Sequence, residues 1–272
     1  MRILFLGDIF GRSGRDVVAK YLPLLKQKLT PHVVIANIEN AAHGFGITPK
    51  IADDLFALGI DVMTSGNHIW DQKDIMPYAD RKEHFLRPYN FPPKTPGKGL
   101  TLFKISTGQN ILVINLMGRT FMDPLDDPFQ SIDHILSIYR LKGNNIGAIF
   151  LDFHAEATSE KMAMAHYLDG RISCVIGTHT HAPTADAQIL DKGTSIQTDA
   201  GMCGDYNSVI GVKPLSPVFK FTRKLPSEKF SPTDGLGTLC GVFIETDDQS
   251  GLSKKINPIR LGPRLLETPL DF

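Results

Sequence analysis

Five short polar segments of this sequence each follow directly behind an apolar run that has the character of a β-strand. Because the carboxyl ends of the strands in an open α/β sheet share one edge, we expect the polar side chains there to converge. Oxygen and nitrogen donors without thiolates suit divalent metals such as Mn, Fe or Zn, and so dense a set is typical of a two-metal hydrolytic site. The segments are Asp8, Glu39-Asn40, Asn67-His68, His154 and His179-Thr180-His181.

The acidic and amide side chains predict how two metals would be shared. Two neighbouring cations need a bridging anion, and Glu39 is the best candidate because it lies at the tip of the second strand. Asp8, at the tip of the first strand, is expected to be a terminal ligand of one metal. His154 and the amide oxygen of Asn67 are expected to complete the shell of the other.

The remaining imidazoles predict the rest of the chemistry. Histidines two apart on extended backbone point to opposite sides, so His179 and His181 are each expected to face a different metal. His68 is left without a metal, and it is placed to donate a proton to a leaving oxygen because imidazole titrates near neutrality. Two divalent ions, two carboxylates and a bridging hydroxide sum to about +1, which suits a phosphodiester monoanion.

The elements that must position these residues alternate between strand and helix in the first 80 residues, which predicts a parallel sheet with right-handed crossovers. Ser13, with Asp16 three residues on, is the expected N-terminal cap of the first helix, and the second helix is expected to begin at Thr48-Pro49. The expected strands are 2–7, 32–38 and 61–65, and the expected helices are 13–29 and 48–59.

The later part of the chain changes in pattern. A hairpin, a helix and a strand are expected over 101–116, 129–142 and 146–153. After residue 181 the strands become shorter, which suggests a second sheet. These shorter strands are 187–190, 194–198, 238–245 and 256–261.

The composition excludes several classes of protein. Lys plus Arg equals Asp plus Glu, 29 against 29, whereas a protein that holds long nucleic acid or an anionic membrane carries a basic excess. No apolar run approaches the roughly 20 residues that span a bilayer, and the first residues are too short an apolar stretch for a signal peptide. The three cysteines are odd in number and widely spaced, as is typical of reduced thiols. We therefore expect a cytoplasmic protein with small substrates and no membrane partner.

The motifs resemble a known family. Gly7-Asp8, Gly66-Asn67-His68 and His179-x-His181 resemble the calcineurin-like metallophosphoesterases, and longer segments are closest to the YmdB-like branch, over residues 1 to about 262. Phe10 stands where the wider superfamily has a histidine, a departure that is itself typical of this branch. The longer segments are Ile38-Glu-Asn-Ala-Ala42, Gly66-Asn-His-Ile-Trp-Asp71, Asp152-Phe-His-Ala-Glu-Ala-Thr-Ser-Glu-Lys161, Gly177-Thr-His-Thr-His181 and Asp199-Ala-Gly-Met-Cys-Gly204.

The resemblance implies an α/β fold of four αββα layers, with residues 1–272 as one metallophosphoesterase domain. It implies 2′,3′-cyclic nucleotide phosphodiesterase activity with two divalent ions, iron or manganese first and zinc or magnesium as alternatives. His68 would be the catalytic acid. The first metal would be held by Asp8, Glu39, Asn40 and His181, and the second by Glu39, Asn67, His154 and His179.

Other functions stay open from the sequence. The runner-up keeps the metals but acts on another small phosphodiester such as 3′,5′-cyclic AMP, or on a phosphomonoester. A third hypothesis is a slow-turnover sensor of cyclic nucleotides or RNA ends that acts through a partner. A homodimer or tetramer is allowed, with residues 205–236 as a surface for it or as a loop over the site. His43 stands where a smaller residue is expected, so it is a candidate for altering substrate fit.

Overall fold

The protein folds as a mixed α/β structure, seen here in a computed structural model that describes residues 1–226 and 228–270. The first half of the chain contains β1 (Arg2–Leu6), β2 (Asp8–Ile9), α1 (Gly11–Leu29), β3 (Val33–Asn37), α2 (Pro49–Leu58), β4 (Val62–Thr64), α3 (Met76–Arg81), β5 (Leu100–Lys104), β6 (Asn110–Met117) and α4 (Pro128–Ile138). The second half contains β7 (Ile146–His154), α5 (Thr158–Tyr167), β8 (Cys174–Thr178), β9 (Gln188–Ile189), β10 (Ser195–Gln197), β11 (Met202–Cys203), α6 (Leu215–Arg223), β12 (Leu239–Thr246) and β13 (Ser253–Leu261).

The first large sheet has five strands in the order β13-β12-β1-β3-β4. Its strands β1, β3 and β4 are parallel, so the alternation predicted for the first 80 residues is confirmed. The second large sheet has six strands in the order β5-β6-β7-β8-β10-β9, and its strands β6, β7, β8 and β10 are parallel. The predicted hairpin forms its edge as β5 and β6.

The expectation that the strands after residue 181 form a second sheet is only partly right, because a second sheet exists but begins with β5, and only β9 and β10 of the later strands expected join it. Strand β12 pairs antiparallel with β1, opposing Ile244 to Ile3, while β9 and β10 extend the second sheet. The residues of β12 are buried on both of its faces at nearly every position. A strand of that kind belongs inside a covered sheet rather than on a half-exposed one, because both faces need apolar neighbours.

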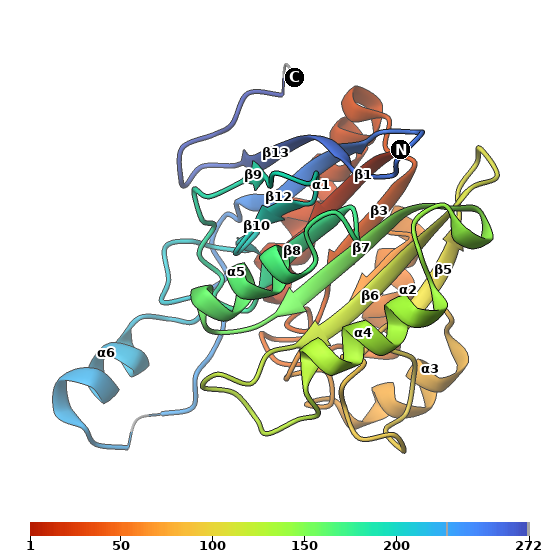
Figure 1. Ribbon diagram of the computed structural model, residues 1–272. Helices are drawn as coiled ribbons and strands as arrows, with labels where there is room; N and C mark the ends of the chain where they lie inside the picture. The colour runs from red at the N-terminus through yellow and green to blue at the C-terminus, as the bar shows by residue number, and fades with distance from the viewer. Residues whose placement is uncertain (227, 271–272) are drawn as a thin grey trace.

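Three large apolar clusters of the described residues hold the elements together. One lies between the two sheets, where the rings of Phe5 in β1 and Phe150 in β7 are 5.0 Å apart. The second packs α1 and α2 against the first sheet, and the third packs α4 and α5 against the second sheet, as Figure 1 shows for the helices over the second sheet. Within residues 1–226 and 228–270, no helix has both the length and the apolar character that crossing a bilayer requires.

The helix ends correct one prediction and confirm another. Helix α1 begins at Gly11 rather than near residue 13, after a Phe10 that has no polar side chain for capping. The Ser13 hydroxyl donates instead to the Gly235 carbonyl at 2.7 Å, so it fastens a distant loop to the helix. Helix α2 starts as predicted, with the Thr48 side chain accepting from the Ile51 N–H and proline at the first position.

Candidate metal centre

The strand-end segments converge, but from two sheets rather than along the edge of one. Asp8, Glu39 and Asn67 follow β1, β3 and β4 of the first sheet, whereas His154 ends β7 and His179 follows β8 of the second. The two sheets pack face to face with these ends on the same side, because Glu39 and His154 are in direct contact. Convergence at strand ends was predicted correctly, and the single sheet was wrong.

The imidazole of His154 is the centre of the cluster. Its Nε2 lies 3.0 Å from Glu39 Oε1, 3.0 Å from Asn67 Oδ1 and 3.1 Å from His179 Nδ1. Glu39, His154 and His179 offer ligand atoms that all lie within 4.8 Å of one another. One carboxylate, one amide oxygen and two imidazoles around one point are a donor set that a divalent transition metal accepts.

Two buried oxygens beside this cluster lack hydrogen-bond partners among the described residues. They are Asp8 Oδ1 and Asn40 Oδ1. Asn40 uses its amide N–H to donate to Gly44 O at 3.0 Å, and Asp8 Oδ2 accepts from the His179 N–H at 3.3 Å. A buried acceptor without a partner is costly, so the two free oxygens fit a second cation site next to the first.

His181 lies outside the tight group around His154, but its hydrogen bonding leaves one ring nitrogen free to bind a metal. Its side chain is buried, and its Nδ1 donates to the Ile210 carbonyl at 2.8 Å. That bond leaves Nε2 as the free nitrogen. Its ring also packs edge-on against Phe10, at 5.3 Å between centroids. The ring of Phe10 therefore supports that of His181.

The charges of the cluster favour a cation. Burial raises the pKa of Glu39, but the charge and hydrogen bond of His154 outweigh it and bring that pKa down to about 2. Burial lowers the pKa of His154, and Glu39 with Asp8 more than reverses this, to about 9. Burial raises the pKa of Asp8 well above its ordinary value. Without metal, a protonated His154 therefore balances the negative charge of Glu39.

Each candidate histidine ligand is held through its other ring nitrogen. His154 Nδ1 lies 2.9 Å from Thr178 Oγ1, and His179 Nε2 lies 3.2 Å from Glu156 Oε2. Such outer contacts orient metal-binding imidazoles and fix which nitrogen is free. The sequence interpretation assigned no role to Thr178 or Glu156.

The backbone at the last two histidines is not extended, so the reason given for their opposite directions was wrong. Strand β8 ends at Thr178, and His179 and His181 have φ angles of 102° and 65°. Residues other than glycine in this region are uncommon and occur at functional sites where surrounding contacts hold them.

Asp199 supplies those contacts. One of its oxygens accepts from the Thr180 N–H at 3.0 Å, the Thr180 hydroxyl at 2.8 Å and Lys161 Nζ at 2.9 Å. Both members of the Lys161–Asp199 pair are buried. From the sequence, Asp199 was one candidate for supporting the histidines, but that role was not adopted, and the contacts with Thr180 and Lys161 now show it.

His68 lies beside the cluster at the edge of a cavity of about 530 Å³. Its Nδ1 is 2.7 Å from Asp71 Oδ2, and its backbone N–H donates to Glu39 Oε2 at 2.9 Å. His43 is exposed and is not among the residues that line this cavity. The cavity walls comprise Phe10, Glu39, Asn40, Gly44, Phe45, His68, Glu156, His179, Thr180, His181, Val209, Ile210, Val212, Pro217, Lys220, Phe221 and Phe230.

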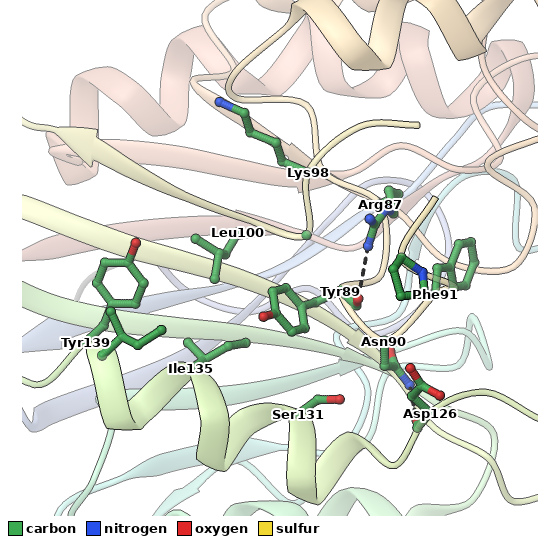
Figure 2. A pocket seen from close by; sticks show the side chains of 13 residues that line it. Arg87, Tyr89, Asn90, Phe91, Lys98, Leu100, Asp126, Ser131, Ile135 and Tyr139 are labelled. Atoms are coloured by element: carbon green, nitrogen blue, oxygen red, sulfur yellow. Dashed lines mark hydrogen bonds between the residues drawn. The ribbon is translucent and has the colours of Figure 1, made fainter. Parts of the chain in front are cut away.

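A second cavity of about 510 Å³ lies between α4 and the segment 87–100 (Figure 2). Its buried Arg87 donates to the carbonyl oxygens of Pro88 and Tyr89, at 2.7 Å and 3.0 Å, and so braces the loop. The candidate ligands named above are not among its lining residues. Of these two cavities, only the one at His68 has candidate metal ligands in its lining, among them Glu39, His179 and His181.

Comparison with known proteins shows the family of this chain. Residues 4–259 match the model of the YmdB-like protein family. The chain belongs to the YmdB-like family. A relative from Bacillus subtilis (strain 168), named 2′,3′-cyclic-nucleotide 2′-phosphodiesterase, is 49% identical over 262 residues, which are 96% of this chain and 97% of that protein.

Two solved structures are similar to this YmdB-like chain over nearly its whole length. A hypothetical protein from Thermus thermophilus has a TM-score of 0.90 and 40% identity, with 97% of this chain and 100% of that chain covered. A protein described as a novel phosphatase, from Mycoplasma pneumoniae, has a TM-score of 0.88 and 33% identity, with 96% and 93% covered.

Proposed function

We propose that this YmdB-like chain is a metal-dependent phosphodiesterase that hydrolyses 2′,3′-cyclic nucleotides to 3′-nucleotides. The observation that carries the proposal is the meeting of Glu39, Asn67 and His179 around Nε2 of His154, next to a cavity that Glu39 and His179 help to line. The Bacillus subtilis relative, at 49% identity, bears the name of this activity. The substrate class follows from that relative, and the metal dependence follows from the donor set.

The candidate ligands divide between two divalent ions, with Glu39 as the bridge and iron or manganese as the expected metals. When bound, the ions would supply Lewis acidity to the phosphate and an acidified water as nucleophile. Two adjacent metal sites would account for both features of this region. One site would lie at the cluster around His154, and the other would use the free oxygens of Asp8 and Asn40. The proposed first set is Asp8, Glu39, Asn40 and His181, and the proposed second set is Glu39, Asn67, His154 and His179.

His68 is the proposed general acid. Asp71 holds its Nδ1, which leaves Nε2 to carry a proton to the 2′ oxygen as that oxygen leaves. The backbone N–H of the same residue holds Glu39 at 2.9 Å. His68 would therefore donate the proton with its side chain and hold the bridging carboxylate of Glu39 with its backbone.

The scaffold that we propose for this site is a four-layer αββα sandwich formed by a single domain over residues 1–272. The three apolar clusters support that arrangement, since one lies between the sheets and two lie under helices. In such a domain both sheets end at the same site, and neither can hold the metals alone.

The test is a substrate panel with purified protein loaded with Mn²⁺ or, under anaerobic conditions, Fe²⁺. Turnover is expected for 2′,3′-cyclic nucleotides, with 3′-nucleotides as products. If the protein hydrolyses 3′,5′-cyclic AMP or phosphomonoesters but not 2′,3′-cyclic nucleotides, the proposed substrate class is wrong.

A variant tests the general acid separately. His68→Ala is expected to lower kcat by about 10²-fold or more while keeping its metal, because Glu39 is held by the backbone of residue 68 rather than by its side chain. His134→Ala removes an exposed imidazole on α4 and is the matched control, with unchanged turnover. Equal activity of the two variants would contradict the role of His68.

A further inference from the structure

The candidate ligand His154 is also hydrogen-bonded to a row of buried polar side chains that are not themselves candidate ligands. The Thr178 hydroxyl lies 2.9 Å from His154 Nδ1 on one side and 2.6 Å from Asp152 Oδ1 on the other. Thr178, His154 and Asp152 are fully buried. Asp8 Oδ1 is 3.9 Å from the same nitrogen, which is too long for a hydrogen bond, so Thr178 is the partner of Nδ1.

Asn37, at the opposite end of this row of hydrogen-bonded side chains from His154, fixes which groups donate and which accept. Asn37 Oδ1 accepts from the Glu39 N–H, so the amide N–H of Asn37 faces Asp152 Oδ2, at 3.0 Å. The Thr64 hydroxyl donates to the same oxygen at 2.5 Å. With donors already on Oδ2, Asp152 acts as an acceptor, and it takes the single hydroxyl proton of Thr178 on Oδ1.

A hydroxyl that has given its proton away can only accept from a third group. Thr178 Oγ1 must therefore receive a hydrogen bond from His154, whose proton then sits on Nδ1. In a neutral imidazole this leaves the lone pair on Nε2. That is the nitrogen with Glu39, Asn67 and His179 around it.

We propose that Thr178, itself held by Asp152, is a positioning residue that fixes His154 in the Nδ1–H tautomer and so keeps Nε2 available to a divalent cation. This rests on the proposed metal centre. Thr178 is neither a candidate metal ligand nor a residue that lines the cavity at His68, so it acts through His154. The hydrogen bonds to Asp152 also connect the two sheets. Asn37 and Thr64 belong to β3 and β4 of the first sheet, whereas Asp152 and Thr178 belong to β7 and β8 of the second.

The first test measures affinity for Mn²⁺ alone, by electron paramagnetic resonance of the free ion. Thr178→Val keeps the shape of the side chain and removes the hydroxyl, and it is expected to weaken Mn²⁺ binding by about 10- to 100-fold. Thr178→Ser restores the hydroxyl and is expected to bind within a few-fold of the wild type.

The matched control is Thr194→Val. Thr194 is also fully buried, and its hydroxyl donates to Ile172 O at 2.7 Å, but it lies in the loop before β10, away from the cluster. A general loss of stability would affect both valine variants, whereas the proposal predicts weaker Mn²⁺ binding only for Thr178→Val. Equal Mn²⁺ affinities for both would overturn it.

A second measurement stands even where a valine variant does not fold. In the wild-type protein loaded with Zn²⁺, ¹⁵N NMR of the histidine rings is expected to show His154 protonated at Nδ1 and unprotonated at Nε2. A proton on Nε2 would overturn the proposal. If the wild-type protein binds neither Mn²⁺ nor Zn²⁺, the metal centre itself is refuted, and that result is distinct from normal metal binding with an unaffected Thr178→Val.

Discussion

At the scale of single residues, Glu39 connects the two parts of the proposed site. One of its oxygens faces His154, and the other accepts from the backbone of His68. A carboxylate with each oxygen turned to a different neighbour suits a bridge between two cations, because each oxygen can serve one ion.

Glu39→Gln is therefore expected to reduce the metal content at both positions, since the uncharged amide leaves two divalent ions too close without an anion between them. Elemental analysis after anaerobic purification measures this, with Glu83→Gln, an exposed position, as control. Loss of only one ion would show that Glu39 is a terminal ligand instead.

Metal binding should release protons. The pKa of His154 in the metal-free protein is about 9, against an ordinary 6.5, so its stabilising charge is fully present below pH 6.5 and is lost as the pH rises through 9. A metal needs the unprotonated nitrogen, so binding between pH 6.5 and 9 must displace this proton.

Calorimetric titration of metal-free protein with Mn²⁺ at about pH 7.5, in two buffers of different ionisation enthalpy, measures the protons released. We expect about one proton or more per cluster, and an apparent affinity that rises with pH up to about 9. The same heat in both buffers would contradict the charge assigned to His154.

At the scale of elements, the sequence predicted what local patterns encode. Thr48 and Pro49 mark the start of α2, and an apolar strand followed by a polar residue identifies Asp8, Glu39 and His154. Pairing partners depend instead on contacts far apart in the chain, so the place of β12 beside β1 could not be read locally. The left-handed backbone at His179 depends likewise on Asp199 and Lys161, which lie on other elements.

Some of the missed support was nevertheless encoded. Alternate residues of a strand share a face, so Asp152 and His154 in β7 must point the same way. A buried carboxylate two residues before a candidate ligand is therefore a signal for an outer contact. For helix α6 the sequence gives no comparable signal. Several apolar residues of this helix, among them Leu215 and Phe221, are exposed rather than buried.

The buried pair between α5 and the segment after β10 gives a prediction at this scale. Lys161→Met is expected to lower the free energy of unfolding by about 3–5 kcal/mol, because it leaves the Asp199 charge buried without its cation. Lys50→Met removes an exposed pair with Asp54 on α2 and should cost at most about 0.5 kcal/mol. Urea denaturation compares the two, and similar losses would mean that the buried pair contributes nothing special.

At the scale of the whole molecule, the packing between the two sheets determines whether the two halves of the site meet. Phe150→Ala removes a fully buried ring next to Phe5 and is expected to cost about 3–5 kcal/mol in unfolding free energy. Phe121→Ala, at a side chain 90% exposed, should stay within about 0.5 kcal/mol of the wild type.

Phe150→Ala also tests whether the packing between the sheets matters for the proposed metal site. Since the ligands come from both sheets, Phe150→Ala is also expected to weaken Mn²⁺ binding under conditions where it remains folded, and equilibrium dialysis measures this. Wild-type affinity in a folded Phe150→Ala protein would show that the strand ends keep their positions independently of the core between the sheets.

The supply of ligands from both sheets has a consequence during synthesis. A nascent chain that has left the ribosome only as far as β4 carries Asp8 and Glu39 but no imidazole from the second sheet. The first sheet also lacks β12, the neighbour of β1, until residues 239–246 have been made. With the proposed ligands, metal acquisition is therefore expected late in biogenesis, and a ribosome stalled before residue 154 should expose a chain that cannot retain its ion.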